Sequence, residues 1–332
     1  MAKNKSEFAQ VIDDLITGKI QTGLPSPKMS RIPKYVYHFT DIGNAVNILK
    51  EGFIYSRNSA IKKSIMKVDN ASATVIQNTE NNRKDYVRFY FRPKTPTQYR
   101  NEGVRAINQI SSELKAHCPV PVFFLFDSYS MLTLENSFFT YGNFANYDTK
   151  IYNDSLSFRN MPFNSVYHES YYDSSVYPDM IKFHRHAELI VPDKCDLTFL
   201  KRIVCRSEAE KETFINLLDE SLKSKFKHHI IVDTKGWFFN STWTFIERVN
   251  MTSDRVTFSF NVNKEMPAFS AKFYLKDLDS NQFETWSQID YRPIESQTLT
   301  FSKPYKLYST ILTLDDHIVY KGNYTSSDSI PY

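Results

Sequence analysis

The chain has 332 residues, of which 41% are hydrophobic and 23% charged, a composition typical of a globular protein with room for two domains of ordinary size. It has only 8 glycines and contains neither a G-x-G-x-x-G nor a G-K-[S/T] sequence, which argues against a Rossmann or P-loop nucleotide site. The three cysteines (Cys118, Cys195 and Cys205) lack metal-ligand spacing and are too few for a disulfide framework, which favours a reducing cytoplasm. Because no apolar run reaches signal-peptide or membrane-span length, we expect no membrane segment.

Charge is distributed unevenly along the chain. Residues 1–229 hold 31 of the 41 basic and 25 of the 37 acidic residues, a net of +6, whereas residues 230–332 hold the other 10 and 12, a net of −2. The basic part is suited to attract a polyanion such as nucleic acid. The excess is modest, and an ordinary soluble basic surface accounts for it about as well.

Hydrophobic spacing, capping residues and turn residues predict the elements before the Glu188 region. In chain order they are a helix over Phe8–Ile20, a linker at residues 23–27, a strand over Lys34–Phe39, a helix over Ile42–Lys50 capped by Thr40 or Asp41 and ending at Gly52, and strands over Tyr86–Phe91 and Val120–Asp127. Residues 59–84 are polar and without a period, so we expect a long mobile loop, of the kind that is usually functional or disordered.

The pattern changes after residue 200. Helical spacing and a capping box formed by Ser207 and Glu210 predict a helix over Ser207–Lys223. Residues 230–332 alternate between apolar and polar, with recurring turn signals, which predicts an antiparallel sandwich or barrel. We therefore place a domain boundary between Lys223 and Lys235.

The segment from Phe183 to Pro192 is the most informative part of the sequence. Leu189-Ile190-Val191 is predicted to be a short buried strand, and Glu188 stands where this apolar run begins. A buried carboxylate is unfavourable unless it is paired, so it usually sits at a strand end facing a pocket. Two histidines and an arginine precede it and suit an anionic ligand. The alternative is an edge-strand glutamate beside a solvated basic face.

Two further segments carry candidate site residues. In Tyr37-His38-Phe39-Thr40 a histidine stands near a strand end before a capped helix, and in the block from Asp85 to Pro96 an aromatic strand leads into a basic turn with two prolines. Each also has a structural interpretation: His38 as a core histidine bonded to a carbonyl, and Arg92 and Lys94 as a solvated turn. The pair His184-x-His186 is by itself weak evidence for zinc, and we expect no metal site.

Together, in this order and spacing, the three segments resemble the DarT family of DNA-targeting ADP-ribosyltransferases over about residues 34–222. The matching motifs are the Y-H-x-T opening with its I-L-x-x-G helix (Tyr37, His38, Thr40, Ile48, Leu49, Gly52), the D-Y-V-x-F-Y-F block (from Asp85) and the A-E-L-I-V strand (Ala187 to Val191). The resemblance implies cleavage of the nicotinamide–ribose bond of NAD through an oxocarbenium-like transition state.

The resemblance also implies roles for individual residues. The catalytic set is Glu188, His38 and Arg57, with Glu188 stabilising positive charge and taking a proton and His38 donating to the ribose or carboxamide of NAD. The expected NAD-binding residues are Tyr37, His38, Thr40, Asn58, Tyr90, Phe91, Arg92 and Lys94, where Tyr90 and Phe91 are candidates for an apolar wall and Arg92 and Lys94 for phosphate contacts. The expected nucleic-acid contacts are Arg83, Lys84, Tyr141, Asn143, Arg185 and His186, although the Tyr/Phe/Asn-rich stretch at residues 139–177 is equally compatible with ordinary packing.

The sequence thus predicts an α+β fold with three parts: an N-terminal helix and linker (1–30), an ADP-ribosyltransferase domain on a split, mostly antiparallel sheet (31–228), and an all-β accessory domain (229–332). The function that the resemblance implies is NAD-dependent ADP-ribosylation of a base, thymine first, in single-stranded DNA by a cytoplasmic, monomeric toxin or anti-phage effector. Its expected partner is a macrodomain antitoxin. The alternatives are transfer to RNA, to guanine in DNA or to protein, and a non-catalytic nucleic-acid-binding defence protein. For the β domain, a regulatory docking role and a purely structural role both stay open.

Overall fold

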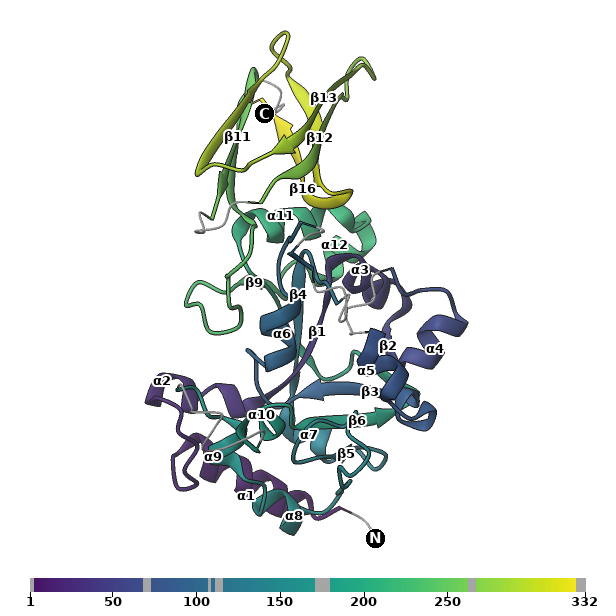
Figure 1. Ribbon diagram of the computed structural model, residues 1–332, viewed down its shortest axis with the longest axis vertical. Helices are drawn as coiled ribbons and strands as arrows, with labels where there is room; N and C mark the ends of the chain where they lie inside the picture. The colour runs from purple at the N-terminus through teal and green to yellow at the C-terminus, as the bar shows by residue number, and fades with distance from the viewer. Residues whose placement is uncertain are drawn as a thin grey trace.

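The structure is a computed structural model that describes residues 3–67, 73–106, 109–110, 116–170, 180–261 and 267–326. A seven-stranded sheet with the order β5-β6-β3-β1-β4-β8-β9 organises the first two thirds of the chain, and its neighbours are antiparallel except for the parallel pair β8–β9 (Figure 1). Its strands are β1 (Tyr35–Asp41), β3 (Tyr86–Tyr90), β4 (Pro121–Asp127), β5 (Phe138–Phe139), β6 (Glu188–Pro192), β8 (Leu200–Cys205) and β9 (Ile230–Val232). The α+β class expected from the sequence is confirmed.

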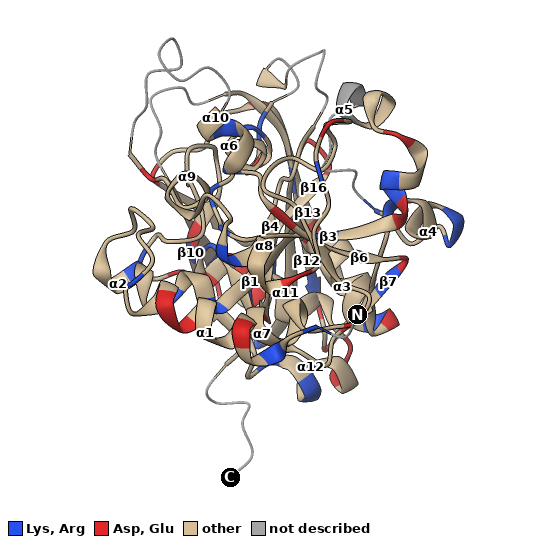
Figure 2. Ribbon diagram, turned by 90° about the horizontal axis from the view of Figure 1, so that it is seen from below, with Lys and Arg blue, Asp and Glu red and all other residues tan. Residues whose placement is uncertain are grey.

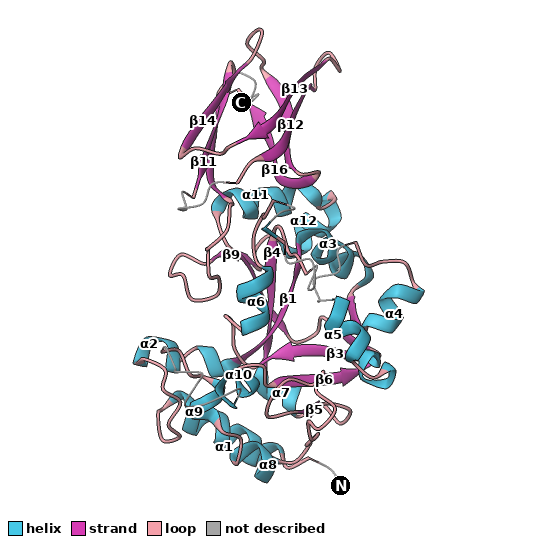
Figure 3. Ribbon diagram, viewed as in Figure 1, coloured by secondary structure: helices cyan, strands magenta, loops and turns pink. Residues whose placement is uncertain are grey.

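Helices surround this sheet (Figure 3). They are α1 (Lys5–Ile16), α2 (Ser26–Met29), α3 (Ile42–Glu51), α4 (Arg57–Lys62), α5 (Ala73–Asn78), α6 (Pro96–Asn101), α7 (Ser128–Leu132), α8 (Ser155–Arg159), α9 (Phe163–Val166), α10 (Met180–His184), α11 (Glu208–Leu217) and α12 (Glu220–Phe226), with 3₁₀ turns η1 (Ile32–Lys34) and η2 (Asn81–Asp85). The short strands β2 (Phe53–Tyr55) and β7 (Lys194–Asp196) pair beside the main sheet. No helix in the described ranges is both long and apolar enough to cross a bilayer.

The interior strand β4 explains why the sheet is covered on both faces. Every residue of β4 before Asp127 is buried, including Phe123, Phe124 and Phe126, and the strand pairs along its length with β1 on one side and with β8 on the other. Since successive strand residues point to opposite faces, a run of large apolar side chains must be covered on both sides. Helices such as α3 and α7, which contact β4, provide this cover.

The predicted helix after β1 is confirmed as α3. The Asp41 side chain accepts a hydrogen bond from the Gly43 N–H at 2.9 Å, so Asp41, and not Thr40, is the cap. Gly52 ends the helix with φ +72°, a left-handed conformation that favours glycine. The first predicted helix is also confirmed, but as α1 it begins at Lys5 and ends at Ile16 rather than Ile20.

Two predictions of local structure were wrong. The expected mobile loop at residues 59–84 contains, in its described parts, the end of α4, α5 and η2. These are one- to two-turn elements held by polar contacts, such as those of the Asn58 amide with the Asn81 carbonyl and Asp85, and such contacts leave no hydrophobic period in the sequence. The helix expected over Ser207–Lys223 is two helices, because Asp219 caps a new one by accepting from the Leu222 N–H at 2.9 Å.

Residues 246–325 form a β-sandwich (Figures 1 and 3). One sheet has the order β10-β11-β14 and the other β13-β12-β15-β16, and Phe258 and Phe273 meet between them with ring centroids 6.2 Å apart. The strands are β10 (Ile246–Met251), β11 (Arg255–Phe260), β12 (Phe269–Asp277), β13 (Phe283–Tyr291), β14 (Ser296–Thr300), β15 (Leu307–Leu314) and β16 (His317–Thr325). The alternating pattern read from the sequence thus corresponds to a sandwich.

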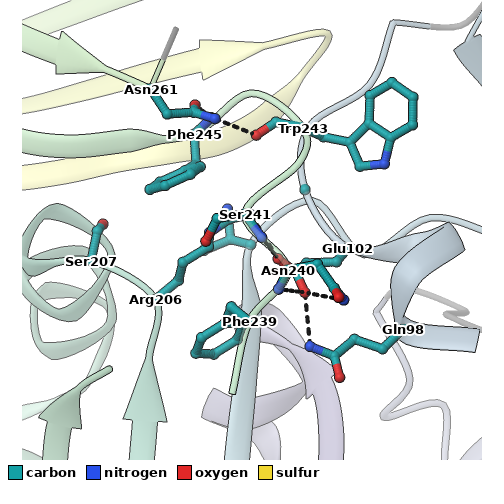
Figure 4. Close-up of polar contacts among 12 residues, drawn as sticks. Gln98, Glu102, Arg206, Ser207, Phe239, Asn240, Ser241, Trp243, Phe245 and Asn261 are labelled. Carbon is teal, nitrogen blue, oxygen red and sulfur yellow. Dashed lines mark hydrogen bonds and ion pairs between the residues drawn. The ribbon is translucent and has the colours of Figure 1, made fainter. Parts of the chain in front are cut away.

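A buried polar network fixes the segment that leads into the sandwich (Figure 4). The carboxylate of Glu102 accepts hydrogen bonds from the Gln98 side chain (2.8 Å) and from the backbone N–H groups of Asn240 (2.9 Å) and Ser241 (2.7 Å). The Arg206 guanidinium lies 3.7 Å from the same carboxylate. All of these groups except the backbone of residues 240–241 come from the first part of the chain, so the network ties this linker to the main sheet.

Contacts also join α11 to the sandwich itself. Each contact is a hydrogen bond between α11 or its cap and a residue of β10 or β16. The hydrogen bonds run from Ser207 Oγ to the Ile246 carbonyl, from Tyr320 Oη to the Glu212 carboxylate, and from the Lys321 N–H to Thr213 Oγ1. Val104, Ala106 and Ala209 belong to the apolar core of the sandwich. The two parts therefore share a packed interface.

Candidate functional site

A cavity of about 260 Å³ lies where β1 and β3 diverge. The two strands share the single register pair Tyr37↔Tyr90, whereas β1 follows β4 from Tyr35 to Asp41. Past that pair the strands separate and the cavity opens between them, closed on its other sides by α3, β2 and α4. Six of its lining side chains carry the chemistry discussed below: His38, Thr40, Arg57, Tyr86, Arg88 and Tyr90.

Glu188 lies one strand further along the sheet, directly opposite Tyr90 of the cavity wall. The Glu188 side chain is 2% exposed, its Oε2 accepts a hydrogen bond from the Phe144 N–H at 2.7 Å, and its Oε1 is 3.9 Å from the Arg88 guanidinium. Burial raises the pKa of Glu188, while Arg88 and the Phe144 N–H act to lower it. A carboxylate with a raised pKa is suited to accept a proton near neutral pH.

The loop that carries the Phe144 N–H is held in place by Arg83. Its guanidinium donates to the carbonyls of Phe144 (2.8 Å), Asn146 (3.0 Å), Tyr147 (2.7 Å) and Thr149 (3.4 Å). Its charge also lies 4.8 Å from the centre of the Phe144 ring. Arg83 was expected to contact nucleic acid, but in this structure its donors are directed at the loop that orients Glu188.

His38 lies in the cavity as a neutral acceptor. Its Nδ1 is 3.1 Å from the Arg88 carbonyl, and burial lowers the pKa of the ring to about 4. A carbonyl can only accept, so the neutral ring donates from Nδ1, and Nε2 is left with a lone pair. His38 therefore offers an acceptor to a ligand N–H or O–H in the cavity, the reverse of the donor role expected from the sequence.

The other residues expected to act with His38 fall into two groups. Thr40, Arg57 and Tyr90 line the cavity as well, and so does Lys84, which was expected to contact nucleic acid. Asn58 does not line it, because its amide bridges to the Asn81 carbonyl and to Asp85 on the solvent side of α4. Asn58 thus holds α4 against η2, and with it the helix that begins at Arg57.

Several residues expected at the NAD site lie elsewhere. Tyr37 is completely buried and donates its hydroxyl to the Ile32 carbonyl, and Phe91 packs against Phe158 in the core. Arg92 and Lys94 line a different depression beyond α6. For Phe91 the reason is the strand period, since it follows Tyr90 and points to the opposite face of the chain. Arg92 and Lys94 follow the end of β3 and lie on the other side of α6.

The residues expected at the nucleic acid are similarly divided. Tyr141 stacks on Tyr152 with centroids 4.3 Å apart, and the Asn143 side chain accepts from the Ala145 N–H within its own loop. Arg185 lines the depression beyond α6. His186 is buried and contacts Thr97 Oγ1 at 2.9 Å, so it braces α6 against the start of β6.

Arg88, which links the cavity to Glu188, is not among the site residues expected from the sequence. The strand period would have found it, because Tyr86, Arg88 and Tyr90 alternate onto one face. Asn44, Asn47, Thr97 and Asn101 of α3 and α6 also line the cavity and were not expected. Among the described residues, no group of three or more histidine, cysteine, aspartate or glutamate side chains could hold a metal ion.

The chain is similar to known proteins both in sequence and in structure. A family model described as "ssDNA thymidine ADP-ribosyltransferase, DarT" matches residues 37–239, which confirms the resemblance noted in the sequence. No curated protein matches the chain.

Among solved structures, the chain is similar to Thermus sp. 2.9 DarT in complex with ADP-ribosylated ssDNA, with 16% identity, 62% of this chain and 97% of that chain covered, and a TM-score of 0.50. The same Thermus protein in complex with NAD⁺ is 16% identical, with 62% of this chain and 98% of that chain covered and a TM-score of 0.47. Thermosipho africanus DarTG in complex with ADP-ribose is 18% identical, with 66% of this chain and 53% of that chain covered and a TM-score of 0.45. At 16% identity, the similarity to the Thermus DarT complex with ADP-ribosylated ssDNA shows a shared fold. Because the family match covers more than half of the sequence, this chain belongs to the DarT family of ssDNA thymidine ADP-ribosyltransferases.

Proposed function

We propose that this chain transfers ADP-ribose from NAD to a thymine base in single-stranded DNA, with NAD in the cavity between β1 and β3. The observation that carries the proposal is the position of Glu188: a buried carboxylate with a raised pKa, opposite the cavity residue Tyr90 and 3.9 Å from Arg88. Family membership supplies the reaction class, and the geometry supports the assignment of roles to individual residues.

In this proposal the bond between nicotinamide and ribose C1′ breaks, and its electron pair leaves with neutral nicotinamide. The ribose then carries oxocarbenium character, which the Glu188 carboxylate stabilises from nearby. The N3 of thymine, which bears the only ring N–H of that base, forms the new bond to C1′. Its proton passes to Glu188, whose raised pKa favours this transfer.

The neighbouring residues bind and orient in this scheme. His38 accepts from a ribose hydroxyl or carboxamide N–H through Nε2. Arg57, at the first turn of α4, and Lys84 supply positive charge at the cavity for the pyrophosphate. Tyr90 provides an aromatic wall at the level of Glu188.

We further propose that the modification is toxic to the cell that carries it and that a macrodomain protein reverses it. The support is the DarT family membership itself. Co-expression with such a protein should restore growth to cells in which this chain alone arrests it.

The test of the enzymatic proposal is mass spectrometry of a mixture of short oligodeoxynucleotides incubated with NAD. We expect a mass increase of one ADP-ribose on thymine-containing strands, and Glu188→Gln should reduce the rate by about 10²-fold or more, the usual scale for a positioned acid–base group. Glu135→Gln, at an exposed position, is the matched control and should be unaffected. Product on RNA, guanine or protein instead, or wild-type turnover by folded Glu188→Gln, would contradict the proposal.

We also propose that the domain division lies near residue 245 and that the sandwich stabilises the catalytic part. The support is that β9 pairs with β8 in the main sheet and that Asn240 and Ser241 satisfy the buried Glu102 carboxylate. The segment up to residue 245 therefore contributes to the first core.

A further inference from the structure

A second cavity, of about 610 Å³, lies on the far side of α6 from the first. Thr97 and Asn101, one helical turn apart, line the first cavity, whereas Pro96, Tyr99 and Arg100 line the second. Side chains three and four residues apart share a helix face, so α6 is the wall between the two cavities. His186 braces this wall through its contact with Thr97 Oγ1.

The second cavity is lined by cationic side chains from three separate segments of the chain. These are Lys28, Arg92, Lys94, Arg100, Lys182 and Arg185. Two of these segments come together because α6 and α10 lie side by side. The lysine of α10 is drawn blue in Figure 2. Among the described residues of the lining, Glu169 is the one carboxylate.

Several of these cations have contacts within the described part of the chain. Glu169 pairs with Lys28 at 2.7 Å and lies 4.0 Å from Arg92. Arg92 is 3% exposed and donates to backbone carbonyls, and burial together with the charge of Arg185 lowers its pKa to about 10. Burial and the charge of Lys28 likewise lower the pKa of Lys94. Arg185 thus repels Arg92, and Lys28 repels Lys94, and an anionic ligand would relieve this repulsion.

We propose that this basic cavity binds backbone phosphates of the single-stranded DNA substrate, on the opposite side of α6 from the NAD cavity. The inference rests on the proposed function and adds to it a binding site for the strand flanking the modified base. Tyr99, which is 59% exposed at the mouth of the cavity, provides a ring on which a neighbouring base can stack. Several arginine and lysine side chains in one cavity are suited to bind successive phosphates of a DNA strand.

The test compares two double variants that each remove one lysine and one arginine. Arg100→Gln/Lys182→Gln changes two exposed residues of the cavity, and Lys201→Gln/Arg202→Gln changes two exposed residues on β8 as the matched control. Affinity for a fluorescent thymine oligonucleotide is measured by anisotropy over a range of salt concentrations, and affinity for NAD by calorimetry. Both readouts are independent of turnover.

We expect the cavity variant to bind DNA about 10-fold more weakly or worse, and the slope of log K against log salt to fall in magnitude by about 1.4, because two phosphate contacts on a single strand are lost. Its NAD affinity should equal that of the wild type. Unchanged DNA affinity and slope would overturn the inference. A loss of NAD affinity instead would also overturn it, since the cavity would then hold the NAD pyrophosphate.

The failure of the proposed function has a different signature. If the wild-type protein binds the oligonucleotide through this cavity but never modifies it in the presence of NAD, the enzymatic proposal fails while the phosphate site stands. Competition by inorganic phosphate or pyrophosphate at concentrations that leave ionic strength constant distinguishes a site for free phosphate from one for a strand. We expect competition only in the millimolar range or above.

Discussion

Replacement of Arg83 by Gln tests whether the 144–149 loop positions Glu188, the proposed catalytic carboxylate. The substitution removes four charge-assisted hydrogen bonds to the backbone carbonyls of that loop and the contact with the Phe144 ring. The Arg83 side chain is 12% exposed, so water replaces these bonds incompletely. The loop then no longer holds the Phe144 N–H at 2.7 Å from Glu188 Oε2.

The size of the effect follows from these contacts. A hydrogen bond from a charged donor contributes about 1.5–3 kcal/mol, and since the four bonds act as one unit we expect a total loss of about 2–4 kcal/mol. If about 2 kcal/mol of this reaches the transition state, kcat falls roughly 30-fold at 1.36 kcal/mol per decade. KM for NAD should change little, because Arg83 does not line the cavity proposed to bind NAD.

The pH profile separates positioning from a general structural effect. The Phe144 N–H acts to lower the pKa of Glu188, so its loss raises that pKa further, and the acid limb of kcat moves to higher pH. Initial rates of oligonucleotide modification across pH measure both quantities. Arg83→Lys, which keeps the charge but cannot reach four carbonyls, should be intermediate, and the exposed Arg202→Gln should match the wild type. A folded Arg83→Gln protein with wild-type kcat and an unmoved acid limb would refute the reasoning.

Three further predictions concern ionisation and stability. Because burial lowers the pKa of His38 to about 4, calorimetric NAD affinity should be flat from about pH 5.5 to 8 and weaken only as pH falls towards 4; a transition centred near pH 6.5 would contradict the neutral acceptor. Arg206→Met leaves the buried carboxylates of Glu102 and Glu210 without their cation and should destabilise the fold by about 3–5 kcal/mol, measured as a lower urea midpoint; an unchanged midpoint would count against the network. A chain ending near residue 245 should be more soluble than one ending near residue 227, because the shorter chain lacks β9 and the backbone donors to Glu102. Equal solubility of the two chains would place the domain boundary before residue 245.

The sequence by itself determined the elements whose signals are local. Asp41 and Gly52 delimit α3 through a cap and a left-handed residue. Period-two alternation over residues 230–332 predicted a sandwich or a barrel, and the structure forms a sandwich. The unfavourable position of a carboxylate at the start of an apolar strand marked Glu188 as a candidate site residue. The reaction class was implied by the resemblance of this and two other segments to the DarT family, which the family match confirms. Such features depend on residues close in sequence.

Only the tertiary structure decided which partners those residues have. The Nδ1 contact of His38 with the Arg88 carbonyl determines its acceptor role, and Arg83 reaches carbonyls 61 to 66 residues away. Arg92 and Lys94 follow Tyr90 closely in sequence, yet they line a separate cavity because α6 stands between the two. Strand register and the placement of one short helix are set by packing across the whole sheet, so no spacing along the chain encodes them.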